Sequence, residues 1–131
     1  IYKYINYKEK KKFISKYKII TPSAAYSGTS GFSRVKKIKP NEIHNETYIS
    51  FYVDTDNQAN SLLSYLKCKL PNFMLSLRKQ THNISKKTCE WIPLPPLDTI
   101  WSDGLLYKKY NLSKKEINII ENKMHNIKYL I

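Results

Sequence analysis

Apolar residues recur at helical spacing over one long stretch in the middle of the chain. They are separated by steps of three or four residues, which places them on one face of a helix. Thr55 and Gln58 precede them at the spacing of a capping box, which satisfies the free amides of a helix's first turn. Pro71 lies within the stretch and removes a helical hydrogen bond, so we expect a kink or two abutting helices. The apolar positions of this core-facing helix are Ala59, Leu62, Leu63, Leu66, Leu70, Phe73, Met74 and Leu77.

Three shorter stretches before this helix have the β-branched and aromatic residues that are typical of strands. They are residues 18–21 (KIIT), 32–38 (FSRVKKI) and 47–53 (TYISFYV). Together they predict a small antiparallel sheet. Residues 1–17 alternate Tyr and Ile with Lys, and this pattern fits either a helix or a strand.

The chain becomes polar and proline-rich after residue 80. Residues 81–88 (THNISKKT) predict a surface loop. Residues 91–96 (WIPLPP) cannot form a helix, so we expect a strand that leads into a linker. Large aromatic residues beside prolines and leucines are typical of a core, so Trp91 and Trp101 are predicted to be structural rather than base-stacking residues.

Two further helices are predicted near the C-terminus. Ser102 can cap a short helix through Tyr110, and Ser113 with Glu116 forms a second capping box. The predicted fold is therefore α+β, in which a small, mostly antiparallel sheet is packed by a kinked central helix at residues 56–80 and closed by the C-terminal helices.

Length and composition predict one domain, because 131 residues with 41% hydrophobic content can bury one core. We expect the domain to span residues 18–127, with an entry segment at 1–17 and a tail at 128–131. The first residue is Ile and the last three are Tyr, Leu and Ile, so the chain is interpreted as a fragment. No apolar run is long enough for a membrane span and no signal peptide is seen, which favours a cytoplasmic protein without membrane contact. The isolated Cys68 and Cys89 lack zinc-site spacing and are expected to be reduced packing residues.

The charge is strongly positive and unevenly distributed. The 23 Lys and Arg exceed the 10 Asp and Glu, giving a net charge of +13 and predicting attraction to polyanions. Residues 1–40 hold ten Lys and one Arg against a single acid, Glu9. An AT-rich coding sequence would also inflate the lysine content without any ligand.

Five stretches of the chain occur in an order that is more specific than any one of them. They combine a Gly-rich loop, a helix that contains SLRK, and a tail of the form PLxxxxxxWxDxxLY. In this order they resemble the C-terminal segments of adenine-specific DNA methyltransferases of type II restriction-modification systems. The similarity covers most of residues 18–127, although Pro71 and residues 1–17 depart from it. The matching stretches are residues 18–32 (KIITPSAAYSGTSGF), 46–51 (ETYISF), 62–86 (LLSYLKCKLPNFMLSLRKQTHNISK), 91–113 (WIPLPPLDTIWSDGLLYKKYNLS) and 114–124 (KKEINIIENKM).

The resemblance implies a target-recognition domain that selects the DNA sequence for a catalytic domain outside this segment. Its partners would be double-stranded DNA and the catalytic domain of the same chain or of a partner subunit. S-adenosylmethionine would belong to the missing methyltransferase domain, and Mg²⁺ only to a nuclease domain, so no cofactor is expected here. The alternative is a protein-protein docking domain within the same kind of complex.

Two groups of candidate DNA contacts lie before the central helix. Hydroxyls of the Gly-rich loop at residues 27–31 can bind phosphate, although a simple hairpin turn is the alternative. In a strand, Arg34 and Lys36 would share one face and Lys37 and Lys39 the other, which we interpret as a solvated edge. Arginine can bind guanine bidentately. The candidates from this half are Ser27, Thr29, Ser30, Arg34 and Lys36.

A third group follows the SLRK motif. Gln and Asn can pair with adenine, Arg with guanine, and Lys or Ser with phosphate. A basic helix end followed by a polar surface loop explains the same residues equally well. The candidates here are Arg78, Lys79, Gln80, His82, Asn83, Ser85 and Lys86.

Catalytic motifs are weak or missing in the sequence. The chain has neither the Gly-rich cofactor loop nor the Asn/Asp-Pro-Pro-aromatic motif of the methyltransferases, so this segment does not transfer methyl groups. Asp103 with Glu121 and Lys123 loosely matches a magnesium nuclease, as does Glu9 with Lys11. We expect these acids to be structural, and a cryptic nuclease remains a third hypothesis.

Overall fold

A computed structural model describes residues 1, 4–5, 12–23, 31–32, 34–78 and 84–124 of the chain. These residues form a four-stranded sheet in the order β1-β4-β2-β3, and every neighbouring pair is antiparallel. The strands are β1 (Tyr4–Ile5), β2 (Tyr17–Pro22), β3 (Lys36–Ile38) and β4 (Tyr48–Val53). The α+β class and the antiparallel sheet predicted from the sequence are confirmed.

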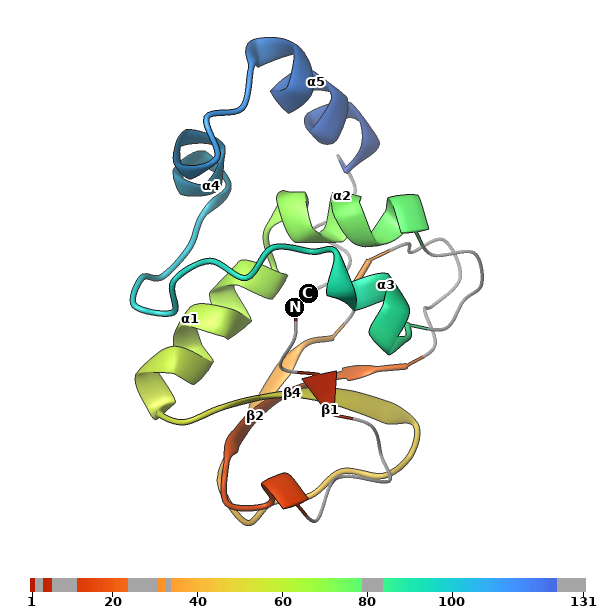
Figure 1. Cartoon of the computed structure of the whole chain (residues 1–131), viewed down its shortest axis with the longest axis vertical. Coiled ribbons are helices and arrows are strands. Elements are labelled where there is room, and N and C mark those ends of the chain that lie inside the picture. Colours follow the sequence, from red (N-terminus) through yellow and green to blue (C-terminus); the bar gives the residue numbers. More distant parts are fainter. Residues whose placement is uncertain (2–3, 6–11, 24–30, 33, 79–83, 125–131) are drawn as a thin grey trace.

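The helices of the described residues stack on one side of this sheet (Figure 1). Helix α1 packs against β2, β3 and β4, while α2 contacts α3, α4 and α5. In Figure 1 the sheet forms the lower part of the molecule and α4 and α5 the upper part. The bounds are α1 (Asp56–Leu66), α2 (Lys69–Arg78), α3 (Lys86–Glu90), α4 (Asp103–Lys109) and α5 (Lys114–Lys123). No helix among the described residues is long and apolar enough to span a bilayer.

The core lies between α1 and the sheet face that carries alternate residues of β2 and β4. Ile19 and Phe51 are fully buried on this face, and the Phe32 ring meets the Phe51 ring edge to face, with 5.8 Å between centroids. Leu62 and Tyr65 of α1 are fully buried on the other side of the core. The helical period predicts the burial of Ala59, Leu62 and Leu66 correctly but misses Tyr65. The prediction that Leu77 faces the core is wrong, because a new helix begins at Lys69 and Leu77 is 55% exposed.

The opposite face of the sheet is covered by the turn at residues 12–16. Phe13 of this turn stacks on Tyr52, with 4.4 Å between ring centroids. Lys18 is only 2% exposed, and its ammonium donates to the carbonyl oxygens of Phe13, Ile14 and Lys16 at 3.5, 3.2 and 2.8 Å. Burial lowers the pKa of Lys18. This lysine is a structural residue of the turn.

The predicted central helix is two abutting helices, and the break precedes the proline. Helix α1 ends before Lys67 and Cys68, and Pro71 is the third residue of α2. A proline in the first helical turn loses no hydrogen bond, because the first amides of a helix have no partner within it. The break is secured by Asn72, whose fully buried amide donates to Leu66 O at 2.8 Å and to Cys68 O at 2.7 Å.

Two segments differ from the prediction. The polar loop predicted at residues 81–88 is wrong at its end, because Ser85 caps α3 through a box with Thr88. The strand predicted at residues 91–96 is also wrong. Residues 93–101 have no regular structure and are bonded to α1. Tyr65 Oη donates to Pro93 O at 2.5 Å, and Ser64 Oγ accepts from Trp101 N at 2.8 Å.

The two C-terminal helices begin where predicted. Ser102 caps α4, and Ser113 with Glu116 forms the capping box of α5. The helices are tied to α2 by side-chain contacts, because Asp103 accepts from Lys69 N at 2.7 Å and Glu121 pairs with the Lys69 ammonium.

Candidate nucleic-acid interface

The structure describes five of the twelve candidate DNA contacts. The described ones are Arg34, Lys36, Arg78, Ser85 and Lys86. Seven candidates belong to two segments, 24–30 and 79–83, which lie outside the described residues. These seven are Ser27, Thr29, Ser30, Lys79, Gln80, His82 and Asn83.

The ends of these two segments are fastened to each other, although more than fifty residues separate them in the sequence. Ser23 directly precedes the first segment, and its carbonyl accepts from the backbone N–H of Ile84, which directly follows the second, at 2.7 Å. Ile84 is buried in the core. This one hydrogen bond places the start of one candidate segment beside the end of the other.

A second link joins the end of the first segment to α2, which leads into the second. Phe32 N donates to Asn72 Oδ1 at 2.6 Å, and both residues are buried. Gly31 lies so close to this amide that a Cβ atom on it would be 2.2 Å from Asn72 Oδ1. Only glycine allows this approach. The start of the first segment therefore lies beside the end of the second, and the residues that follow the first segment are held by the N-terminal half of α2.

Arg34 and Lys36 do not lie in one continuous strand. Arg34 has φ 46°, a left-handed conformation that ends the extended backbone, and β3 begins at Lys36. The prediction that strand alternation sets both side chains on one face is therefore wrong. Both residues are exposed.

Lys37 faces α1 rather than solvent. Its ammonium contacts Asp56 at 2.7 Å and Asn60 at 2.9 Å, so this lysine ties the edge strand to the first turn of α1. The interpretation of Lys37 as a solvated edge residue is wrong for this reason. Lys39 is exposed.

Arg78 is the last residue of α2 and stands at the entrance to the second segment. Its guanidinium carbon lies 5.0 Å from the centroid of the Trp91 ring, which is a cation-π distance. Trp91 is the half-buried C-cap residue of α3. This contact orients the exposed guanidinium of Arg78 directly before the second candidate segment.

Ser85 and Lys86 occupy the start of α3. The Ser85 hydroxyl accepts from Thr88 N at 3.3 Å, so it caps the helix. Lys86 is the first residue of α3 and is exposed.

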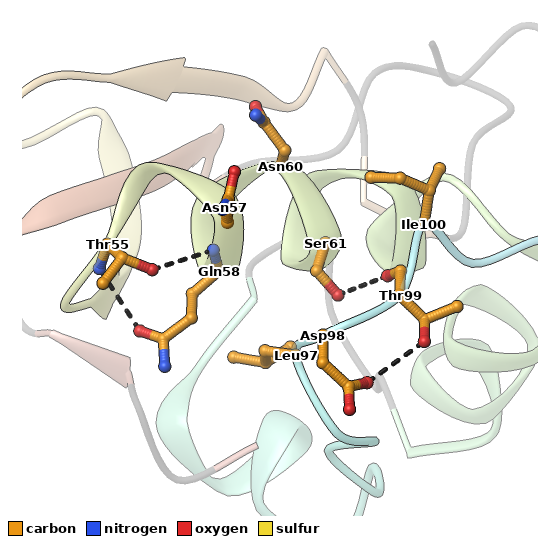
Figure 2. Close-up of a pocket in the computed structure, with 9 residues that line it drawn as sticks. All are labelled: Thr55, Asn57, Gln58, Asn60, Ser61, Leu97, Asp98, Thr99 and Ile100. Carbon is orange, nitrogen blue, oxygen red and sulfur yellow. Dashed lines mark hydrogen bonds between the residues drawn. The ribbon is translucent and has the colours of Figure 1, made fainter.

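A polar pocket that includes none of the candidate DNA contacts lies between α1 and residues 97–100 (Figure 2). It has a volume of about 440 Å³ and is lined by the N-terminal half of α1 and by residues 97–100. Ser61 Oγ donates to Thr99 O at 2.5 Å and holds the two walls together. The amides of Asn57 and Gln58 and the carboxylate of Asp98 line the opening. This pocket could not be predicted from the sequence, because polar residues on the outer face of a helix predict only a solvated surface.

Of the acids that loosely match a nuclease motif, Asp103 and Glu121 are engaged in structural contacts, whereas Glu9 lies outside the described residues. Glu121 accepts from Tyr107 Oη at 2.7 Å and pairs with Lys69, whose hydrogen bond lowers the pKa of the Glu121 carboxyl. The described residues contain no group of three His, Cys, Asp or Glu that could hold a metal ion.

The two cysteines are free and buried. Burial raises the pKa of both Cys68 and Cys89 to about 12, so their thiols are protonated at neutral pH. A protonated thiol is a poor nucleophile and a poor metal ligand. Their chemistry matches the packing role expected from the sequence.

No family model matches this chain, and no curated protein or solved structure matches it either. Its function is therefore inferred from the residues and their geometry.

Proposed function

We propose that this chain is a sequence-specific recognition module for double-stranded DNA in a restriction-modification enzyme. It positions duplex DNA for a methyltransferase or nuclease domain that lies outside these residues, in the cytoplasm. The observation that carries the proposal is the hydrogen bond between Ile84 N and Ser23 O, because it places the start of one polar candidate segment beside the end of the other. Two stretches that are rich in DNA-binding residue types, and far apart in the sequence, are thereby joined at these ends.

The residue chemistry of this region suits both parts of DNA recognition. Hydroxyls of Ser27, Thr29 and Ser30 and the ammonium of Lys86 are suited to phosphates, which fix the position of a protein on the duplex. Arginine binds guanine bidentately and asparagine or glutamine binds adenine, so Arg34, Arg78, Gln80 and Asn83 are the proposed base contacts. The net charge of +13 adds a long-range attraction that speeds the encounter.

The proposal is tested by fluorescence anisotropy with a labelled duplex of random sequence over a series of salt concentrations. Counterion release makes the logarithm of the affinity fall linearly with that of salt, with a slope of about −0.9 for each phosphate contacted. The double variant Arg34→Asn with Arg78→Ala removes two exposed cations of the interface. Asparagine is chosen at residue 34 because it tolerates a positive φ.

The control is the double variant Lys108→Ala with Lys114→Ala, which removes the same charge from exposed positions of α4 and α5. We expect the interface variant to bind at least about tenfold more weakly, because two proposed base contacts are lost, while the control binds nearly as the unchanged protein does. An equal loss of DNA affinity in both variants would mean that the protein binds DNA only by diffuse charge attraction, which would refute the proposed interface. Absence of DNA binding at low salt would refute the proposal as a whole.

A further inference from the structure

A groove between α2 and α5 presents apolar side chains to solvent. It has a volume of about 290 Å³ and is lined mainly by Phe73, Met74 and Leu77 of α2, Ile119 of α5, and Trp91. Leu77 is 55% exposed and Ile119 is 51% exposed, so two large aliphatic side chains stand at its rim. Contiguous exposed apolar surface of this kind marks interaction sites in soluble proteins.

The charges around the groove are predominantly positive. Lys115 and Lys123 lie four residues before and after Ile119 on α5, so they flank it along the same helix face, and both are exposed. Arg78 follows Leu77 and covers the Trp91 ring. The acid in the groove is Glu116, and its carboxylate is already used in the capping box, where it accepts from Ser113 N at 2.8 Å.

Trp91 adds an unused donor beside this surface. Its indole Nε1 is buried and has no hydrogen-bond acceptor among the residues that the structure describes. Buried polar groups are nearly always paired, so an unpaired one calls for an explanation. Because this donor is buried, a partner bound in the groove would contact the Trp91 ring rather than its Nε1.

We propose that this groove binds an amphipathic helix of a partner polypeptide whose apolar face is flanked by Asp and Glu. Its apolar side chains would fill the space between α2 and α5, as in other helix-in-groove complexes, and its carboxylates would meet Lys115 and Lys123. A second copy of this chain is a poor occupant, because it carries the same net charge of +13. Since α2 ends at Arg78, the partner would lie beside the proposed DNA interface, although the groove does not depend on DNA binding.

The test uses a synthetic, fluorescein-labelled peptide of about 18 residues, or five helical turns. Leu and Phe occupy one helical face and Glu the flanks, and a scrambled peptide of identical composition serves as the peptide control. Binding is followed by anisotropy with the whole 131-residue chain. Trp91 emission is followed in parallel in a Trp101→Phe background, in which Trp91 is the remaining tryptophan.

The protein variants are Leu77→Asp with Ile119→Asp, and a matched control, Ile43→Asp with Ile100→Asp. The control residues are 60% and 64% exposed, so both variants lose two exposed aliphatic side chains and gain the same charge. We expect saturable binding of the amphipathic peptide, a change in Trp91 emission, and at least about tenfold weaker binding in the groove variant only. Circular dichroism verifies that both variants are folded.

Three outcomes would overturn the proposal. They are equal binding of the scrambled peptide, equal losses in both protein variants, and no saturable binding up to about 1 mM peptide. Sedimentation equilibrium tests whether a second copy of the chain occupies the groove. A concentration-dependent dimer that the groove variant abolishes would assign the groove to that second copy and overturn the proposal. DNA affinity measured on the same samples separates failure here from failure of the proposed recognition function.

Discussion

Replacing Asn72 by alanine should destabilise the whole domain, because this side chain holds three segments together. Its amide donates to the carbonyl of Leu66, the last residue of α1, and to that of Cys68, which lies between α1 and α2, and its carbonyl oxygen accepts from Phe32 N. The last carbonyls of a helix have no partner within it, and here the Asn72 amide satisfies that of Leu66. In the alanine variant, all three backbone groups lose this partner inside the protein.

The expected loss follows from these three hydrogen bonds. A typical intramolecular hydrogen bond contributes about 1 kcal/mol to stability, and a buried group left without a partner costs about 1–3 kcal/mol. The higher helix propensity of alanine returns roughly 0.5 kcal/mol. Three such groups at about 1 kcal/mol or more each, less this return, give an expected fall in the free energy of unfolding of at least about 2.5 kcal/mol. This is a large part of the roughly 5–15 kcal/mol that stabilises a typical domain.

Urea unfolding followed by far-ultraviolet circular dichroism and tryptophan fluorescence measures this loss. The matched control is Asn57→Ala, which removes the same amide from an exposed position of α1 and should change stability by less than about 0.5 kcal/mol. A variant of Asn72 without a cooperative transition would count as a loss at least equal to the stability of the unchanged protein. A measured loss below about 1 kcal/mol would refute the role assigned to this side chain.

Three further predictions concern buried residues. Gly31→Ala should lower the urea midpoint strongly, because its Cβ would meet Asn72 Oδ1 at 2.2 Å; a midpoint within error of the unchanged protein would contradict this close approach. Cys68 and Cys89 should resist Ellman's reagent at pH 8 in the folded protein and react after unfolding, since burial raises their pKa to about 12; rapid reaction of the folded protein would exclude such burial. The folded state keeps thiol protons that the unfolded chain releases above pH 9.0. The two thiols should therefore lower the free energy of unfolding as pH rises from 9.0 towards 12. Urea midpoints measured at pH 8 and 10 test this prediction.

Local sequence signals predicted the fold well where they depend on neighbouring residues. The capping boxes at Thr55 and Ser113 both start helices, because the hydroxyl and the side chain three residues later satisfy amides of the same turn. Helix α3 was missed because its box uses Thr88 in place of Glu or Gln, and because the two lysines inside the box, Lys86 and Lys87, are typical of a surface loop.

Features that depend on distant residues could not be predicted. The left-handed backbone at Arg34 has no local signal such as glycine or asparagine. The contact of Lys37 with Asp56 requires the packing of β3 on α1, and the link from Ser23 to Ile84 joins two regions far apart in sequence. For the same reason, the sequence could supply the candidate DNA contacts but not the hydrogen bond that places the start of one candidate segment beside the end of the other.

Lys18 shows that lysine content in this protein is more than a coding bias. Its ammonium presents three N–H groups in a tetrahedral arrangement, and three carbonyls of the preceding turn receive them. The planar guanidinium of arginine has a different donor geometry and a larger volume, so it does not fit this arrangement. A version of the protein recoded from lysine to arginine, for example to direct chemical labels to chosen sites, would therefore have to keep lysine at position 18.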